Sequence, residues 1–129
     1  MKVYVYRNLH KNCWSVKALE GENKGRVIHH AQNVNLTDCT FKVSKAGRER
    51  VLREQCKNVH AGVVGTLSFV GDMGDTGLWK SASTYYAFVP VTYNPYKYNT
   101  FVRKNNDHIE MHSSREVFLN QDRSVYAMV

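Results

Sequence analysis

The chain has 129 residues, of which 43% are hydrophobic and 22% are charged, and its formal net charge is +7. This length corresponds to about one domain, and the composition is that of a globular protein, which excludes an intrinsically disordered chain. A basic charge favours phosphate-rich partners without identifying one. No apolar run reaches the roughly 18 residues that a membrane span requires, so we expect no membrane partner.

Cysteine usage favours a reducing compartment. Cys13, Cys39 and Cys56 are an odd number, whereas a small secreted domain usually carries paired cysteines. The N-terminal residues contain no long apolar segment and no small-residue cleavage site, so we expect no signal peptide. We therefore expect a cytoplasmic location. His and Cys recur at a few short spacings, but none forms a CxxC pair. We therefore expect no metal and no cofactor.

The first 43 residues read as four strands. Apolar and polar residues alternate with a period of two, as in Val3 and Val5 against Lys2 and Tyr4, which is typical of half-buried strands. A Gly-Glu-Asn-Lys-Gly turn interrupts them. The expected strands cover residues 2–6, 13–18, 26–31 and 34–43, with a break near residues 32–33.

A helix is predicted over residues 45–56, with Ser44 as its N-cap. Residues 42–60 around it carry six Lys or Arg against two Glu, which is four of the seven net positive charges. Arg50, Arg53 and Lys57 would share one face of such a helix. A helix that packs by one side and presents cations on the other suits a polyanion, and the alternative is an ordinary solvated face.

The remainder of the chain contains further strands and a glycine-rich segment. The strongest strand pattern covers residues 58–70, and another strand spans 85–93, where Pro90 indicates an edge strand or a bulge. Residues 71–77 hold three glycines in seven. Within a single domain of residues 1–129, we interpret them as a loop between an N-terminal ββ(β)αβ part and a Tyr-rich β C-terminal part.

The two ends of the chain resemble each other. Such matches are compatible with two similar β-units that pack face to face, or with the chance similarity of β-hairpins. The matched residues are Asn8/Asn94, Lys11/Lys97, Val16/Val102, Lys17/Arg103, Ile28-His29/Met111-His112 and Val34-Asn-Leu36/Val117-Phe-Leu119.

These patterns together predict an α+β fold. A twisted antiparallel sheet, or two similar β-units, would pack against one main helix near 45–56. The alternative is an all-β barrel in which that segment is only a short turn.

Candidate nucleic-acid contacts come from the basic helix and from a Tyr-rich turn after Asn94-Pro95. Cations would contact phosphates, whereas exposed tyrosines would stack on bases or form a protein-binding surface. The candidate residues are Lys45, Arg48, Arg50, Arg53, Lys57, His60, Tyr96, Lys97 and Tyr98.

Catalysis is a weaker hypothesis. Metal-independent RNA cleavage needs an acid/base pair and a cation beside the phosphate, and His60 with Glu49 or Glu54 supplies the residue types. No spacing proves that they converge, and the more usual role for such a residue is that of a structural His whose ring is satisfied by a backbone carbonyl.

Two segments, 44–53 and 57–65, resemble those of small uncharacterised proteins carried by phages and other mobile elements, as does Tyr93-Asn-Pro-Tyr-Lys97 followed by Phe101-Val102. The resemblance implies a bacterial host cytoplasm, and it brings no activity and no site residues. The leading hypothesis is a small, non-enzymatic nucleic-acid-binding accessory protein. The alternatives are a protein-binding inhibitor of a host or defence factor and a metal-independent ribonuclease.

Overall fold

The computed structural model of the chain describes residues 1–44, 46, 49–50, 53, 61–71, 88–94, 98, 100–103 and 110–128. The N-terminal half contains β1 (Lys2–Asn8), β2 (Cys13–Ala18), β3 (Val27–Ala31), β4 (Asn33–Val43) and β5 (Ala61–Gly71). The C-terminal half contains β6 (Phe88–Thr92), β7 (Phe101–Arg103), β8 (Glu110–Met111), β9 (Ser113–Leu119) and β10 (Val125–Met128).

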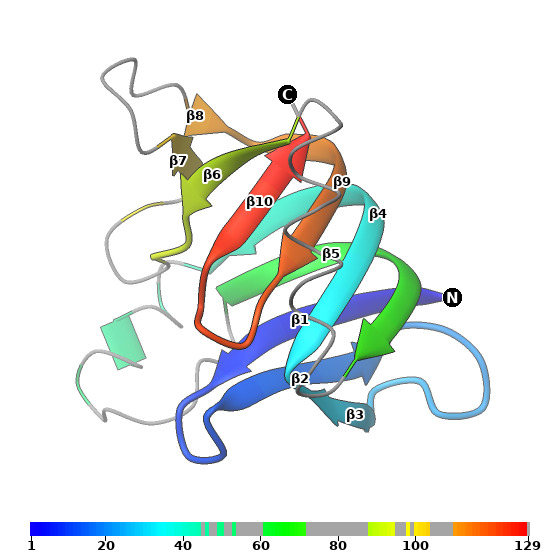
Figure 1. The fold of residues 1–129 in the computed structure, drawn as a ribbon. Helices are drawn as coiled ribbons and strands as arrows, with labels where there is room; N and C mark the ends of the chain where they lie inside the picture. Colours follow the sequence, from blue (N-terminus) through cyan, green and yellow to red (C-terminus); the bar gives the residue numbers. More distant parts are fainter. Residues whose placement is uncertain are drawn as a thin grey trace.

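These strands form one antiparallel sheet in the order β3-β2-β1-β5-β4-β9-β10-β6-β7-β8 (Figure 1). The outer strands are β3 and β8, and within the described ranges no pairing joins them, so the sheet is open. The four strands predicted within the first 43 residues correspond to β1–β4. The strand predicted over 58–70 is β5 from Ala61 onward, and its first three residues lie outside the described residues.

The strand order repeats within the sheet. From the centre outward, one half runs β4-β5-β1-β2-β3 and the other runs β9-β10-β6-β7-β8, so every strand has a counterpart five strands later. The central pair, β4 and β9, is antiparallel, which relates the two halves by a local two-fold arrangement. The cross-strand pair Val5–Val63 in one half corresponds to Val91–Val125 in the other, and all four valines are buried.

Several of the residues that match between the two ends of the sequence lie on corresponding strands. Val16 is on β2 and Val102 on β7, whereas Ile28 is on β3 and Met111 on β8. The apolar pairs of β4 and β9 even face each other, because Val34 pairs with Leu119 and Leu36 with Val117.

The apolar faces of the two halves enclose one core. Trp14 on β2 packs edge-on against Tyr93, which follows β6, with ring centroids 5.3 Å apart. Phe41 on β4 packs against Phe101 on β7 at 4.7 Å. Burying one such large apolar side chain contributes about 1.5–3 kcal/mol, so these cross-half contacts hold the halves together.

The α+β prediction with a main helix near 45–56 is wrong. The described residues contain strands and no helical element, although Ala46, Glu49, Arg50 and Arg53 individually have helical backbone conformation. The other residues of 45–56 lie outside the described residues. The physical reason for the error is that the second half of the sheet, instead of a helix, covers the apolar face of the first half. The alternative of an all-β barrel is right in that the described residues form strands only, but it is wrong about the barrel, because no pairing among these residues closes the sheet.

The prediction that Pro90 indicates an edge strand or a bulge is wrong. Pro90 lies in β6, which pairs with β10 on one side, without a shift of register, and with β7 on the other. Phe69 in β5 is a large apolar side chain that is 51% exposed. No helix within the described residues is long and apolar enough to cross a membrane.

Candidate functional site

Most of the predicted site residues fall outside the described part of the chain. Glu49, Arg50 and Arg53 are described and exposed, which suits a solvent-facing charged segment. The amide N–H of Tyr98 donates to the carbonyl oxygen of Asn94 at 2.9 Å, and the Tyr98 side chain is half-buried. The structure therefore does not test whether the predicted site residues converge on one site. The candidates that lie outside the described residues are Lys45, Arg48, Glu54, Lys57, His60, Tyr96 and Lys97.

A lysine-lined hollow lies on the outer face of the N-terminal half. Tyr4 on β1 pairs with Lys17 on β2 and with Val64 on β5, so these three side chains leave the same face of the sheet. Val3 and Val5 on either side of Tyr4 point into the core. The hollow has a volume of about 300 Å³. Its lining consists of Tyr4, Lys17, Leu19, Lys42, Val43, Ser44 and Val64.

The charge of this hollow is positive. Lys17 and Lys42 come from different strands, and the lining residues that the structure describes include no carboxylate. Burial, and then the neighbouring Tyr6 at a ring distance of 5.9 Å, raise the pKa of Tyr4, so its phenol stays protonated and can donate a hydrogen bond. The hollow thus combines two cations with a neutral donor, which suits an anionic ligand.

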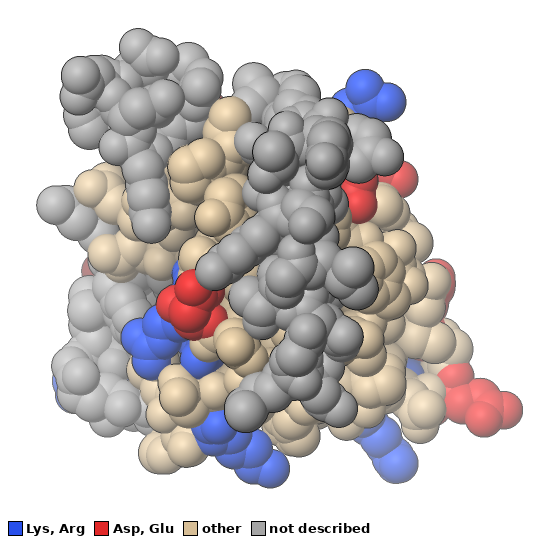
Figure 2. Space-filling model, viewed as in Figure 1, with Lys and Arg blue, Asp and Glu red and all other residues tan. Residues whose placement is uncertain are grey.

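The hollow also adjoins the basic segment found in the sequence. Lys42 is the first residue of 42–60, and Ser44, which lines the hollow, precedes the predicted helix. On the face of the molecule seen in Figure 2, the described Lys and Arg stand in separate groups instead of one continuous patch. The hollow holds two of the lysines, Lys17 and Lys42. Sequence reasoning missed Tyr4 and Lys17, although period-two alternation places both on the polar faces of their strands.

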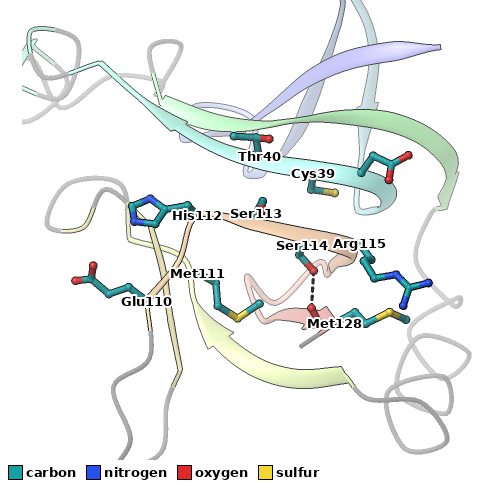
Figure 3. A pocket seen from close by; sticks show the side chains of 10 residues that line it. Cys39, Thr40, Glu110, Met111, His112, Ser113, Ser114, Arg115 and Met128 are labelled. Carbon is teal, nitrogen blue, oxygen red and sulfur yellow. Dashed lines mark hydrogen bonds between the residues drawn. The ribbon is translucent and has the colours of Figure 1, made fainter.

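A larger hollow, about 700 Å³, lies among β4, β8, β9 and β10 (Figure 3). Burial raises the pKa of Cys39 to about 12, with Asp38 and Glu116 adding to the rise, so its thiol stays protonated and is a poor nucleophile. The Ser114 hydroxyl lies 2.9 Å from the carbonyl oxygen of Met128, and Figure 3 shows His112 and Arg115 toward opposite ends. The titratable groups do not converge on one point.

Metal binding finds no support in the described ranges, where no three His, Cys, Asp or Glu side chains are placed to hold an ion together. Of the two hollows, the lysine-lined one is the better candidate for a binding site, because its two lysines and the protonated Tyr4 phenol all suit an anionic ligand.

Comparison with known proteins gives a phage relative. The profile of the family described as Mycobacterium phage L5 gene 82 protein matches residues 1–127. The Gene 82 protein of Mycobacterium phage L5 is 40% identical over 117 residues, which cover 81% of this chain and 79% of that protein. No solved structure matches the chain. The resemblance to phage proteins noted in the sequence is thereby confirmed.

Proposed function

The chain belongs to the family of the Mycobacterium phage L5 gene 82 protein, and from this premise we propose that it is a small nucleic-acid-binding accessory protein acting in the bacterial host cytoplasm. One observation carries the proposal. Lys17 and Lys42 line a hollow together with Tyr4, no carboxylate is among the described residues of its lining, and the basic segment 42–60 begins there.

Physical chemistry supports a phosphate chain as the ligand. Lysines placed on a surface bind phosphates as point charges, and exposed Arg50 and Arg53 would extend the contacts along the backbone. A volume of about 300 Å³ is at the lower end of ligand sites, which suits one nucleotide unit of a polymer. Contacts of this kind position the nucleic acid without reading its sequence.

Salt-dependent binding tests the proposal. Fluorescence anisotropy would follow labelled single- and double-stranded DNA and RNA at about 50 and 200 mM salt. We expect Lys17→Gln with Lys42→Gln to weaken binding. The slope of log K against log salt should also fall by about 2, because two phosphate contacts are lost.

The matched control removes the same charge elsewhere. Lys24 lies in the exposed turn after β2, and Arg115 lies exposed on β9, so Lys24→Gln with Arg115→Gln changes the net charge equally. The control should keep nearly the full salt slope. Absence of binding at 50 mM, or equal losses in the two double variants, would refute the proposal and direct the search toward a host or defence protein.

Cleavage is tested separately on the same RNA. Glu49 is exposed, whereas His60 and Glu54 lie outside the described residues, so no observed geometry favours the ribonuclease hypothesis. Incubation in EDTA with the wild type and with His60→Ala decides it. Cleavage that needs His60 while binding is kept would assign catalysis in addition to binding.

A further inference from the structure

One row of side chains crosses the outer face of the N-terminal half at the lysine-lined hollow. Lys17, Tyr4 and Val64 stand side by side on β2, β1 and β5, because Tyr4 pairs with both of the others. Lys42 on β4 pairs with Gly62, two positions from Val64 along β5, so its side chain leaves the same face at the far end of the row. An aromatic and an aliphatic side chain thus separate the two lysines of the hollow.

Two neighbouring groups support the ring of Tyr4. A Cβ built on Gly62 would lie 3.2 Å from Cε2 of this ring, so the ring rests against the β5 backbone at a position where a glycine leaves room for it. The ring of Tyr6, which is 3% exposed, lies 5.9 Å from that of Tyr4 between centroids. Tyr4 itself is only half-buried. A supported aromatic ring therefore contributes accessible surface to the wall of the hollow.

Phosphate binding accounts for only part of the lining. Lys17 and Lys42 supply the cations that a phosphate chain requires. Leu19, Val43 and Val64 line the same hollow, and all three are half-buried aliphatic side chains. A phosphate placed against them would lose hydration without gaining a hydrogen bond. The face of a nucleic-acid base gains contact there, and it stacks on an aromatic ring whichever base it belongs to.

We propose that the lysine-lined hollow takes one unpaired base of a single-stranded nucleic acid. This inference rests on the function proposed above, and it adds that the ligand is single-stranded. The base would stack on the ring of Tyr4, while Lys17 and Lys42 would contact the phosphates on either side of that nucleotide. A duplex base is already stacked and paired, so it reaches such a hollow only at the cost of being extruded from the helix.

Fluorescence anisotropy with strands of about ten nucleotides tests this on the wild type. The probes are a thymidine strand, a uridine strand, a strand of abasic nucleotides with the same number of phosphates, and a duplex of the same length. We expect a base-bearing strand to bind about 5- to 150-fold more tightly than the abasic strand. It should also bind more tightly than the duplex, although the duplex carries more charge. This preference in either sugar supports the proposal and identifies the strand as DNA or RNA.

Tyr4→Leu tests the stacking contact, because leucine keeps an apolar side chain and removes the ring. Its affinity for the base-bearing strand should fall about 5- to 150-fold, whereas its affinity for the abasic strand should stay unchanged. The slope of log K against log salt should also stay unchanged, since no phosphate contact is lost. Tyr126→Leu is the matched control: Tyr126 on β10 is half-buried like Tyr4 and does not line the hollow, so this variant should bind like the wild type.

Equal affinities for the base-bearing and abasic strands would overturn the proposal. A duplex that binds as tightly as the single strand would also overturn it. In that case a lower salt slope in Lys17→Gln with Lys42→Gln would still support nucleic-acid binding, whereas no binding to any probe would overturn both proposals. A folded Tyr4→Leu variant that binds like the wild type would place the base elsewhere. If this variant does not fold, the comparison of strands on the wild type still decides.

Discussion

Replacing Gly62 by alanine should destabilise the sheet where β1 and β5 meet. A Cβ at this position would overlap the carbonyl oxygen of Val5 and come within 3.0 Å of its carbonyl carbon. The clash involves backbone atoms, so no side-chain rotation relieves it, and β1 must move by about 1 Å. Overpacking costs about 1–3 kcal/mol, and losing one or two ladder hydrogen bonds adds about 1 kcal/mol each. We expect a loss of about 4 kcal/mol.

Urea unfolding at constant m and thermal unfolding measure this loss. A loss of about 4 kcal/mol corresponds to a fall of about 15 °C in Tm for a chain of this size. Gly25→Ala is the control, because its φ of 86° strains alanine although no atom lies within 4 Å, and it should cost only about 1–2 kcal/mol. Without a clash, alanine at position 62 would instead stabilise by about 0.4–1 kcal/mol through the unfolded state. A neutral or stabilised Gly62→Ala would therefore refute the reasoning.

Two further predictions concern the core. Trp14→Phe leaves the Asn120 carbonyl oxygen without the indole donor and should lower the free energy of unfolding by about 2–4 kcal/mol in urea; a loss below about 1 kcal/mol would contradict it. Because burial raises the pKa of Cys39 from 9.0 to about 12, the unfolded chain releases this proton first. Stability should therefore be full below about pH 9 and fall at higher pH by about 1.4 kcal/mol per pH unit for this thiol. Cys39→Ala should reduce that slope between pH 9 and 10, and an unchanged slope would show that the thiol does not contribute.

The strands of the first half were predictable because each carries its own signal. Val3, Val5, Val16 and Leu36 alternate with polar residues, and all four are buried as their spacing predicts. The error on the helix arose from a long-range effect. Which element covers the apolar face depends on contacts such as Phe41 with Phe101, 60 positions apart, and local periodicity carries no information about them.

The candidate sites were less predictable, since each depends on the register between strands. Alternation alone places Tyr4 and Lys17 on polar faces, but only the β1–β2 pairing brings them side by side. The burial of Arg7 did have a signal in the sequence, because Arg7 shares the parity of Val3 and Val5 and thus lies on a core-facing row.

The repeated strand order also separates the scaffold from the charged segment. The two halves differ most in one of their loops. Residues 44–60 join β4 to β5, whereas the corresponding link from β9 to β10 is only residues 120–124. The longer link lies within the stretch that holds four of the seven net positive charges, and the shorter one holds one Asp and one Arg. The buried positions that both halves share therefore lie in strands, while the excess charge lies in a segment that the repeat does not require. Because Arg50 and Arg53 in that segment are exposed, neutralising them should cost within about 0.5 kcal/mol of stability. A loss of nucleic-acid binding in such variants would then reflect lost phosphate contacts and not an unfolded sheet.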